Sequence, residues 1–355
     1  MHTVGPVFGG PVFDAIWRRG AGVTLALSQA SHALSVILAL LGHRGMRAPV
    51  VWVPGYYCES GLGPLRNSAA QLRFMPVTEA MAPDWPALDT MLAQGPAPDL
   101  FILPHLFGAE GEAATARAFC DACGAFLLED AAHLLRPVGQ VGSHGDLVSF
   151  SPRKWLGLDD AGVLVIRHSE LIDGLEPALD SLSKMRLVPH RRQRFAWRRW
   201  LPFPLPRPLP ERKMEQEPGP AKLFAAPWMS VNSFRRITEG GAPLLERVAQ
   251  EEALTVARIE AALRGLRGLT PLPRRPDATP YLLGFRAESD IRAADLHREL
   301  RLAGAIAASW PGLPPEVWAE PQLYGAAVRL RRTVIRLTPR FASGRHPLDF
   351  VSRMA

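Results

Sequence analysis

Residues 127–166, LLEDAAHLLRPVGQVGSHGDLVSFSPRKWLGLDDAGVLVI, decide the fold. An apolar strand closes on the acidic pair Glu129-Asp130, and a second short strand leads through Ser149 to Lys154. Because neighbouring parallel strands end at the same edge of a sheet, the Asp130 and Lys154 side chains can project into one cleft.

This pairing of a carboxylate with a lysine is what a pyridoxal 5′-phosphate site requires. The carboxylate keeps the pyridine nitrogen protonated, which makes the ring an electron sink. The lysine amine forms a Schiff base to the cofactor and moves protons once it is released. Taken singly, an acidic pair at a strand end is usually a solvated turn and a lysine usually lies at the surface. The combination with Ser149, which can bind phosphate, indicates a cofactor site.

The sequence before and after Lys154 alternates helical patterns with short apolar strands. Helices are expected over Ser28–Leu41, Gly61–Ser68, Pro83–Ala93 and Glu110–Cys123. Strands are expected over Pro49–Pro54, Gln71–Val77, Leu100–Pro104, Ala125–Glu129, Asp146–Phe150 and Gly162–Arg167. This rhythm predicts an α/β fold, with a mostly parallel sheet covered by helices.

The C-terminal third has a different pattern. A long amphipathic helix is expected over Ala242–Leu266, followed by strands at Tyr281–Phe285 and Thr333–Leu337 and a helix at Ala293–Leu302. We therefore expect a large cofactor domain over residues 1–240 and a small α+β domain over residues 241–355. Within the large domain, residues 185–222 are rich in proline and arginine and contain Trp197–Trp200; they are interpreted as an extended arm or lid.

The central stretch resembles the DegT/DnrJ/StrS family of sugar aminotransferases. That family has a strand ending E-D-(A/C)-A-(H/Q), then G-D, then S-F-x-x-x-K, then a glycine-containing turn into an apolar strand. The corresponding residues here are Glu129-Asp130-Ala131-Ala132-His133, Gly145-Asp146, Ser149-Phe150 with Lys154, and Asp160-Ala161-Gly162. Weaker matches are Ser28–Leu34, Val53–Tyr57 and Pro104–Gly108.

The resemblance implies a fold-type-I transferase, with a seven-stranded type of sheet, that binds pyridoxal 5′-phosphate as a homodimer. It implies that Lys154 forms the Schiff base, that Asp130 pairs with the pyridine nitrogen and that His133 contacts the ring or its 3-oxygen. Ser149 and Ser31 would bind phosphate beside Ala30, which replaces a glycine of the family's helix start. Tyr56 or Tyr57 would line the ring, and the sequence leaves open which of the two.

Three further residues are candidates for substrate binding. Arg336 and Arg340 end the last expected strand, where many fold-type-I enzymes hold a substrate carboxylate bidentately. His105 follows another strand end. The alternatives are surface positions for the arginines and a structural role for the histidine.

The resemblance implies a transaminase that moves an amino group from an amino acid, L-glutamate, to a keto-sugar. The sugar would be nucleotide-linked, and the product would enter surface-polysaccharide or secondary-metabolite biosynthesis. Two alternatives remain: another pyridoxal-phosphate reaction such as a lyase or dehydratase, and a non-catalytic regulatory relative. The altered positions Ala30, Asp159 and Ala161 favour the last.

Composition excludes several other classes. The net charge is +7, but no nucleic-acid-binding motif accompanies the basic residues. No apolar run approaches the ~20 residues of a membrane-spanning helix, and no secretory signal is recognisable. Cys120 and Cys123 lack the second Cys/His pair that a zinc site needs, so no metal is expected. A cytoplasmic enzyme acting on small-molecule substrates is the expectation.

Overall fold

The computed structural model describes residues 8–184, 227–310 and 312–339, and all that follows concerns them. Its centre is a seven-stranded sheet in the order β1-β7-β6-β5-β4-β2-β3. The strands are β1 (Val23–Leu27), β2 (Val50–Pro54), β3 (Gln71–Met75), β4 (Leu100–Pro104), β5 (Phe126–Asp130), β6 (Leu147–Phe150) and β7 (Gly162–Ile166). β3, β2, β4, β5 and β6 pair in parallel, and β7 is antiparallel to both β6 and β1.

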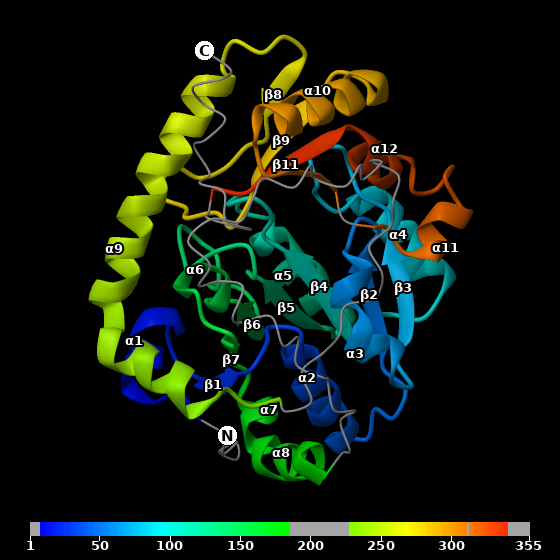
Figure 1. Ribbon diagram of the computed structural model, residues 1–355. Helices are drawn as coiled ribbons and strands as arrows, with labels where there is room; N and C mark the ends of the chain where they lie inside the picture. Colours follow the sequence, from blue (N-terminus) through cyan, green and yellow to red (C-terminus); the bar gives the residue numbers. More distant parts are fainter. Residues whose placement is uncertain (1–7, 185–226, 311, 340–355) are drawn as a thin grey trace.

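Helices cover both faces of this sheet (Figure 1). The helical elements are α1 (Gly10–Trp17), α2 (His32–His43), η1 (Glu59–Gly61), α3 (Gly63–Arg66), α4 (Trp85–Gln94), α5 (Ala113–Cys123), α6 (Arg153–Leu156), α7 (Ser169–Asp173) and α8 (Leu175–Lys184). Apolar side chains of α2, α3 and α8 pack with one set of alternate strand residues, while α4 and α5 pack with the other set. β2 and β4 are consequently buried along their whole length, as parallel strands between helical layers must be.

A second, antiparallel sheet is formed by the part of the chain that follows the long helix α9 (Val231–Leu263). Its order is β10-β11-β9-β8, formed by β8 (Leu269–Pro271), β9 (Leu283–Ala287), β10 (Ala307–Ser309) and β11 (Val334–Leu337). The accompanying helices are α10 (Asp290–Ala303), α11 (Pro315–Ala319) and α12 (Gly325–Thr333). In Figure 1, α9 extends along one side of the molecule from α1 towards β8.

The α/β fold predicted from the sequence is confirmed. Several expected boundaries shift by a few residues, and two of the shifts have a clear local reason. α2 begins at His32 rather than Ser28, because residues 28–31 form the turn between β1 and the helix. α9 begins at Val231 rather than Ala242, where the Ser230 side chain caps it, and it continues past Gly241, whose φ of 52° is not helical.

The proposed division at residues 240 and 241 falls at this non-helical glycine and stays a prediction. The expected arm at 185–222 lies entirely outside the described residues. None of the helices in the described ranges combines the length and the apolar character needed to cross a membrane.

Candidate active site

A cavity of about 310 Å³ opens where the carboxyl ends of β2, β4, β5 and β6 meet residues of the second sheet. Its walls include eight of the predicted site residues: Ala30, Ser31, Tyr56, Tyr57, Asp130, His133, Ser149 and Lys154. Arg336 also lines it. The parallel strands therefore bring together residues that are far apart in the sequence, as ligand sites of open α/β sheets require.

Asp130 ends β5 with both carboxylate oxygens engaged. Oδ1 accepts hydrogen bonds from the backbone N–H of Ala132 at 3.0 Å and from Oγ of Ser149 at 3.2 Å. Oδ2 accepts a hydrogen bond from the hydroxyl of Tyr57 at 2.5 Å. Three donors on both oxygens fix the orientation of the carboxylate.

Lys154 lies in the first turn of the short helix α6. Its Nζ donates to the backbone oxygen of Ala132 at 2.9 Å and lies 4.7 Å from the centre of the Tyr281 ring. Burial lowers the pKa of Lys154 to about 8, although the nearby charge of Asp130 acts in the opposite direction. About a tenth of the amine is therefore unprotonated at pH 7, far more than for a lysine of ordinary pKa, and the unprotonated form is the nucleophile.

His133 forms part of the cavity wall between two aromatic rings. Its ring centre lies 5.7 Å from that of Phe107 and 6.0 Å from that of Tyr281. Burial, followed by the charges of Lys154 and Arg336, holds the pKa of His133 well below its ordinary value, so the ring is neutral. Its buried Nδ1 has no hydrogen-bond partner within the described structure. An unpaired polar atom on a cavity wall is a position where a ligand can supply the missing bond.

The residues predicted to bind phosphate lie at the start of α2. Ser31 occupies the N-cap position, and its side chain makes no capping hydrogen bond. The strand β7 approaches this turn closely, since a Cβ on Gly162 would collide with the backbone of Gln29 and Ala30. Ser149 hydrogen-bonds to Asp130 instead, so its contacts support a role in orienting that carboxylate.

The two candidate tyrosines have different partners. The Tyr56 hydroxyl donates to the backbone oxygen of Met81 at 2.9 Å, and its backbone oxygen accepts from the Trp310 indole at 3.0 Å. Tyr56 is therefore held by backbone groups, whereas Tyr57 donates directly to the Asp130 carboxylate in the cavity wall. Burial raises the pKa of Tyr57, and the charge of Asp130 raises it further, so the phenol stays protonated and donates.

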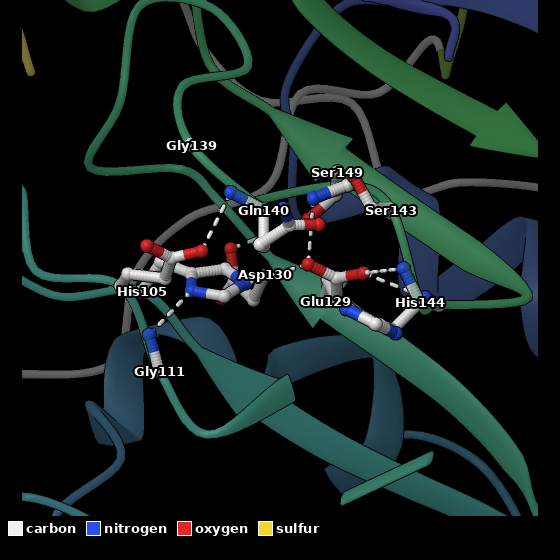
Figure 2. A network of polar contacts seen from close by, with 12 residues as sticks. His105, Gly111, Glu129, Asp130, Gly139, Gln140, Ser143, His144 and Ser149 are labelled. Atoms are coloured by element: carbon white, nitrogen blue, oxygen red, sulfur yellow. Dashed lines mark hydrogen bonds and ion pairs between the residues drawn. The ribbon is translucent and has the colours of Figure 1, made fainter. Parts of the chain in front are cut away.

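His105 does not line the cavity. Its side chain is fully buried, and its Nε2 lies 2.8 Å from Oε2 of the fully buried Glu129. Its Nδ1 accepts the backbone N–H of Gly111 at 2.9 Å, so the proton resides on Nε2 and points at Glu129 (Figure 2). The substrate role considered for His105 gives way to a structural one, because both ring nitrogens are already bonded within the chain.

Glu129 fixes the loop that connects β5 to β6. Besides His105, its carboxylate accepts backbone N–H groups from Gly142 at 2.6 Å, His144 at 2.9 Å and Gly145 at 2.6 Å (Figure 2). Burial opposes the charge, but the hydrogen bonds from His105 and the loop amides outweigh it and hold the pKa of Glu129 below its ordinary value. This network joins the residue after β4 and the loop between β5 and β6 to Glu129, the neighbour of Asp130.

Of the two C-terminal arginines, the structure places Arg336 in the cavity wall. Its Nε donates to the backbone oxygen of Ser309 at 2.6 Å, and burial lowers its pKa to about 10. No carboxylate of the described chain forms an ion pair with it. Arg340 lies outside the described residues.

Sequence reasoning missed several wall residues: Phe107, Arg153, Tyr281 and Trp310. Tyr281 and Trp310 come from the distant second sheet and its connections, and no local pattern marks them. Arg153 did have a signal, because it is a charged residue inside the motif that ends at Lys154.

The residues of this cavity fit pyridoxal 5′-phosphate. Lys154 offers a buried amine, Asp130 a fixed carboxylate, and the unpaired Nδ1 of His133 a free position on the wall. By contrast, no group of His, Cys, Asp and Glu within the described ranges is arranged to hold a metal ion.

Comparisons with known proteins find similarity at the level of structure. No family model matches the sequence, and no curated protein matches it. A DegT/DnrJ/EryC1/StrS aminotransferase from Brucella abortus shares 16% identity at a TM-score of 0.64, over 94% of this chain and 86% of that one. PseC of Helicobacter pylori, an aminotransferase involved in pseudoaminic acid biosynthesis, shares 12% at a TM-score of 0.66, over 97% and 86%.

NtdA of Bacillus subtilis, solved with the cofactor PMP bound, shares 15% identity at a TM-score of 0.63. The alignment covers 94% of this chain and 72% of that one. At such identities the likeness establishes the fold. The chain has the fold of the DegT/DnrJ/EryC1/StrS aminotransferases, which is the fold-type-I architecture that the sequence resemblance implied.

Proposed function

We propose that the protein is a pyridoxal-phosphate-dependent aminotransferase that moves an amino group from an amino acid to a keto-sugar. The observation that carries the proposal is the placement of Lys154 and Asp130 in one cavity, with a pKa of about 8 for the amine and three hydrogen-bond donors on the carboxylate. The shared fold supports it, as does the presence of PMP, the amino form of the cofactor, in NtdA.

Bound pyridoxal phosphate supplies the electron sink for this chemistry. The protein supplies binding, orientation and proton transfer. Asp130 would hold a proton on the ring nitrogen, because a half-buried carboxylate with fixed geometry stabilises the positive charge opposite it. His133 is neutral and lies between two aromatic rings, where it can contact the ring face and use its free Nδ1 as a hydrogen-bond partner.

Lys154 has two tasks. Its amine would bind the cofactor, and once free the neutral Nζ would take a proton from the donor α-carbon and deliver it to C4′ of the cofactor. A pKa of about 8 suits both directions of transfer, because efficient general acid–base groups titrate near the working pH. The contact of Nζ with the backbone oxygen of Ala132 gives the released amine a fixed resting position.

Arg336 is the residue we assign to the carboxylate of the amino donor. Its guanidinium lines the cavity and pairs with no described carboxylate, so a substrate carboxylate would neutralise it. By resemblance the donor is L-glutamate. The acceptor is proposed to be a nucleotide-linked keto-sugar of polysaccharide or secondary-metabolite biosynthesis, and the enzyme to act as a cytoplasmic homodimer. The involvement of the structural neighbour PseC in pseudoaminic acid biosynthesis supports the acceptor class.

The test uses the cofactor-loaded protein and L-glutamate without an acceptor. We expect up to one equivalent of 2-oxoglutarate per active site, because the first half-reaction stops when the cofactor is aminated. Adding nucleotide-linked keto-sugars one by one should then give turnover with the correct acceptor. Release of the amino group as free ammonia, rather than its transfer to the cofactor and then to an acceptor, would indicate a lyase or dehydratase, and no product with any amino acid would indicate a non-catalytic relative.

A further inference from the structure

The cavity carries more positive than negative charge. Three basic groups line it, Arg153, Lys154 and Arg336, and Asp130 is the only carboxylate among the described lining residues. Two of these groups have partners, since Lys154 bonds to Ala132 and Arg336 bonds to Ser309. The cavity therefore suits two anionic groups, of which the proposed donor carboxylate at Arg336 is one.

Arg153 is the basic group without a partner. Its guanidinium makes no hydrogen bond or ion pair with any residue in the described ranges, and its Nε is buried and unpaired. Burial lowers its pKa, although Tyr281 and Asp160 act in the opposite direction. A buried donor without an acceptor is costly, and a buried charge without a counter-charge is more so. An anion in the cavity would remove both costs.

The backbone places Arg153 near the start of α2. The N–H of Arg153 bonds to the oxygen of Ala161 at 3.3 Å. The next residue, Gly162, packs directly on the backbone of Gln29 and Ala30. Ala30 and Ser31 line the same cavity as Arg153. The backbone of Arg153 and the helix start are thus linked through residues 161 and 162, and both contribute to the wall of the cavity.

That helix start has few amides to offer. The N–H groups of His32, Ala33 and Leu34 already bond to the oxygens of Gln29, Ala30 and Ser31, at 3.1, 2.9 and 3.2 Å. A helix N-terminus holds a phosphate through such amides when they are free. Since the first turn uses these three itself, the N–H groups of Ala30 and Ser31 are what remains for an anion among the described residues there, and a doubly charged phosphate is bound more tightly with a cationic side chain beside them.

We propose that Arg153 binds the cofactor phosphate, from the same chain and the same short helix that provide Lys154. The inference rests on the proposed function, because the phosphate is that of pyridoxal phosphate. Arg153 and Arg336 then divide the two anions of the reaction between them: Arg336 in β11 takes the donor carboxylate, and Arg153 at the start of α6 takes the phosphate monoester.

The experiment compares pyridoxal phosphate with pyridoxal, which has the same aldehyde and ring but no phosphate. Both are titrated into cofactor-free protein and followed by the absorbance of the lysine-bound form. Arg153→Gln should weaken binding of pyridoxal phosphate roughly 10- to 100-fold, the range for a charge-assisted hydrogen bond. It should change pyridoxal binding less than about twofold, because pyridoxal has no phosphate for Arg153 to contact.

Two further variants act as controls. Arg153→Lys keeps the positive charge but lacks the planar guanidinium that can donate two hydrogen bonds. It should therefore recover part of the preference for pyridoxal phosphate over pyridoxal. Arg336→Gln removes the other cavity guanidinium and should leave the ratio of the two affinities unchanged. Inorganic phosphate, added with pyridoxal, should tighten pyridoxal binding in the unmodified protein and not in Arg153→Gln.

The outcomes separate this inference from the proposed function. If the unmodified protein binds neither compound, the proposed function fails. If it prefers pyridoxal phosphate and Arg153→Gln keeps the same ratio, the role of Arg153 is overturned and the function stands. If Arg153→Gln does not fold, as judged by circular dichroism, two other measurements decide. They are the ratio of the two affinities in Arg153→Lys and the effect of inorganic phosphate on pyridoxal binding in the unmodified protein. An unchanged ratio together with no phosphate effect would overturn the role of Arg153.

Discussion

The hydroxyl of Tyr57 lies 2.5 Å from Oδ2 of Asp130 and donates a hydrogen bond to it. This contact connects the loop that follows β2 to the end of β5, and both residues line the cavity. It distinguishes Tyr57 from Tyr56, which bonds to the backbone of Met81 instead.

Removing this hydroxyl should weaken cofactor binding. Tyr57→Phe leaves Asp130 with the Ser149 and Ala132 donors, both on Oδ1, so Oδ2 loses its hydrogen bond and the carboxylate is less firmly oriented. The loss of a hydrogen bond to a charged group, about 1–2 kcal/mol, corresponds to a roughly 5- to 30-fold rise in the Kd for pyridoxal phosphate. The matched control is Tyr56→Phe, whose Kd should stay within about twofold; equal effects in the two variants would contradict the assignment.

Asp130 should be the most sensitive carboxylate of the site. Asp130→Asn keeps the shape but removes the charge opposite the ring nitrogen. By analogy with broken buried ion pairs, we expect a loss of about 3–5 kcal/mol in cofactor binding or in kcat/KM. The exposed Asp159→Asn, in the turn after α6, serves as the control and should change neither. Near-normal activity of Asp130→Asn would refute the role.

Lys154 should make stability depend on pH in a defined window. Its pKa is about 8 in the folded protein and 10.5 ordinarily, so the unfolded chain binds more protons between these values. The free energy of unfolding of the cofactor-free protein should therefore rise with pH from about 8 towards 10.5. Denaturant unfolding of Lys154→Met should lack this rise, about 3 kcal/mol in full. Parallel curves for the two proteins would show that the amine is not buried as described.

The Glu129 network should support the fold at neutral pH and fail in acid. The pKa of Glu129 is lower in the folded state than its ordinary 4.5, so its contribution is complete above that pH and is lost as the pH falls. Glu129→Gln should cost about 3–5 kcal/mol of unfolding free energy at pH 7, because four donors face the carboxylate. Glu299→Gln, which breaks an exposed pair with Arg292, should cost under about 1 kcal/mol. A similar cost for the two variants would rule out the network as a major stabilising element.

Much of the large sheet could be predicted because its strands are short apolar runs that end in polar or turn residues. The expected strands at β4 and β5 match to within one residue, and Asp130 falls at the strand end as expected. β1 was not assigned as a strand of its own, and its antiparallel pairing with β7 is a long-range contact that no local period encodes. The short strands β8 and β10 have three residues each, too few to show alternation.

The candidate site divides in the same way. Lys154 and Asp130 could be found because they lie close together in the chain, around two consecutive strands. Tyr281 and Trp310 could not, because they reach the cavity from the second part of the chain through tertiary packing. Ser149 was found, but its partner, Asp130, depends on the register between β5 and β6. The burial that sets the pKa of Lys154 likewise exists only in the folded chain.

The most direct test of the central claim is the absorbance spectrum of the purified protein with pyridoxal phosphate, before and after L-glutamate is added. We predict a visible band from the lysine-bound cofactor that disappears in Lys154→Ala and remains in Lys184→Ala. In the unmodified protein, L-glutamate should convert this band to that of the amino form of the cofactor. A protein that shows no such band after incubation with pyridoxal phosphate, or one whose band survives the loss of Lys154, would contradict the account.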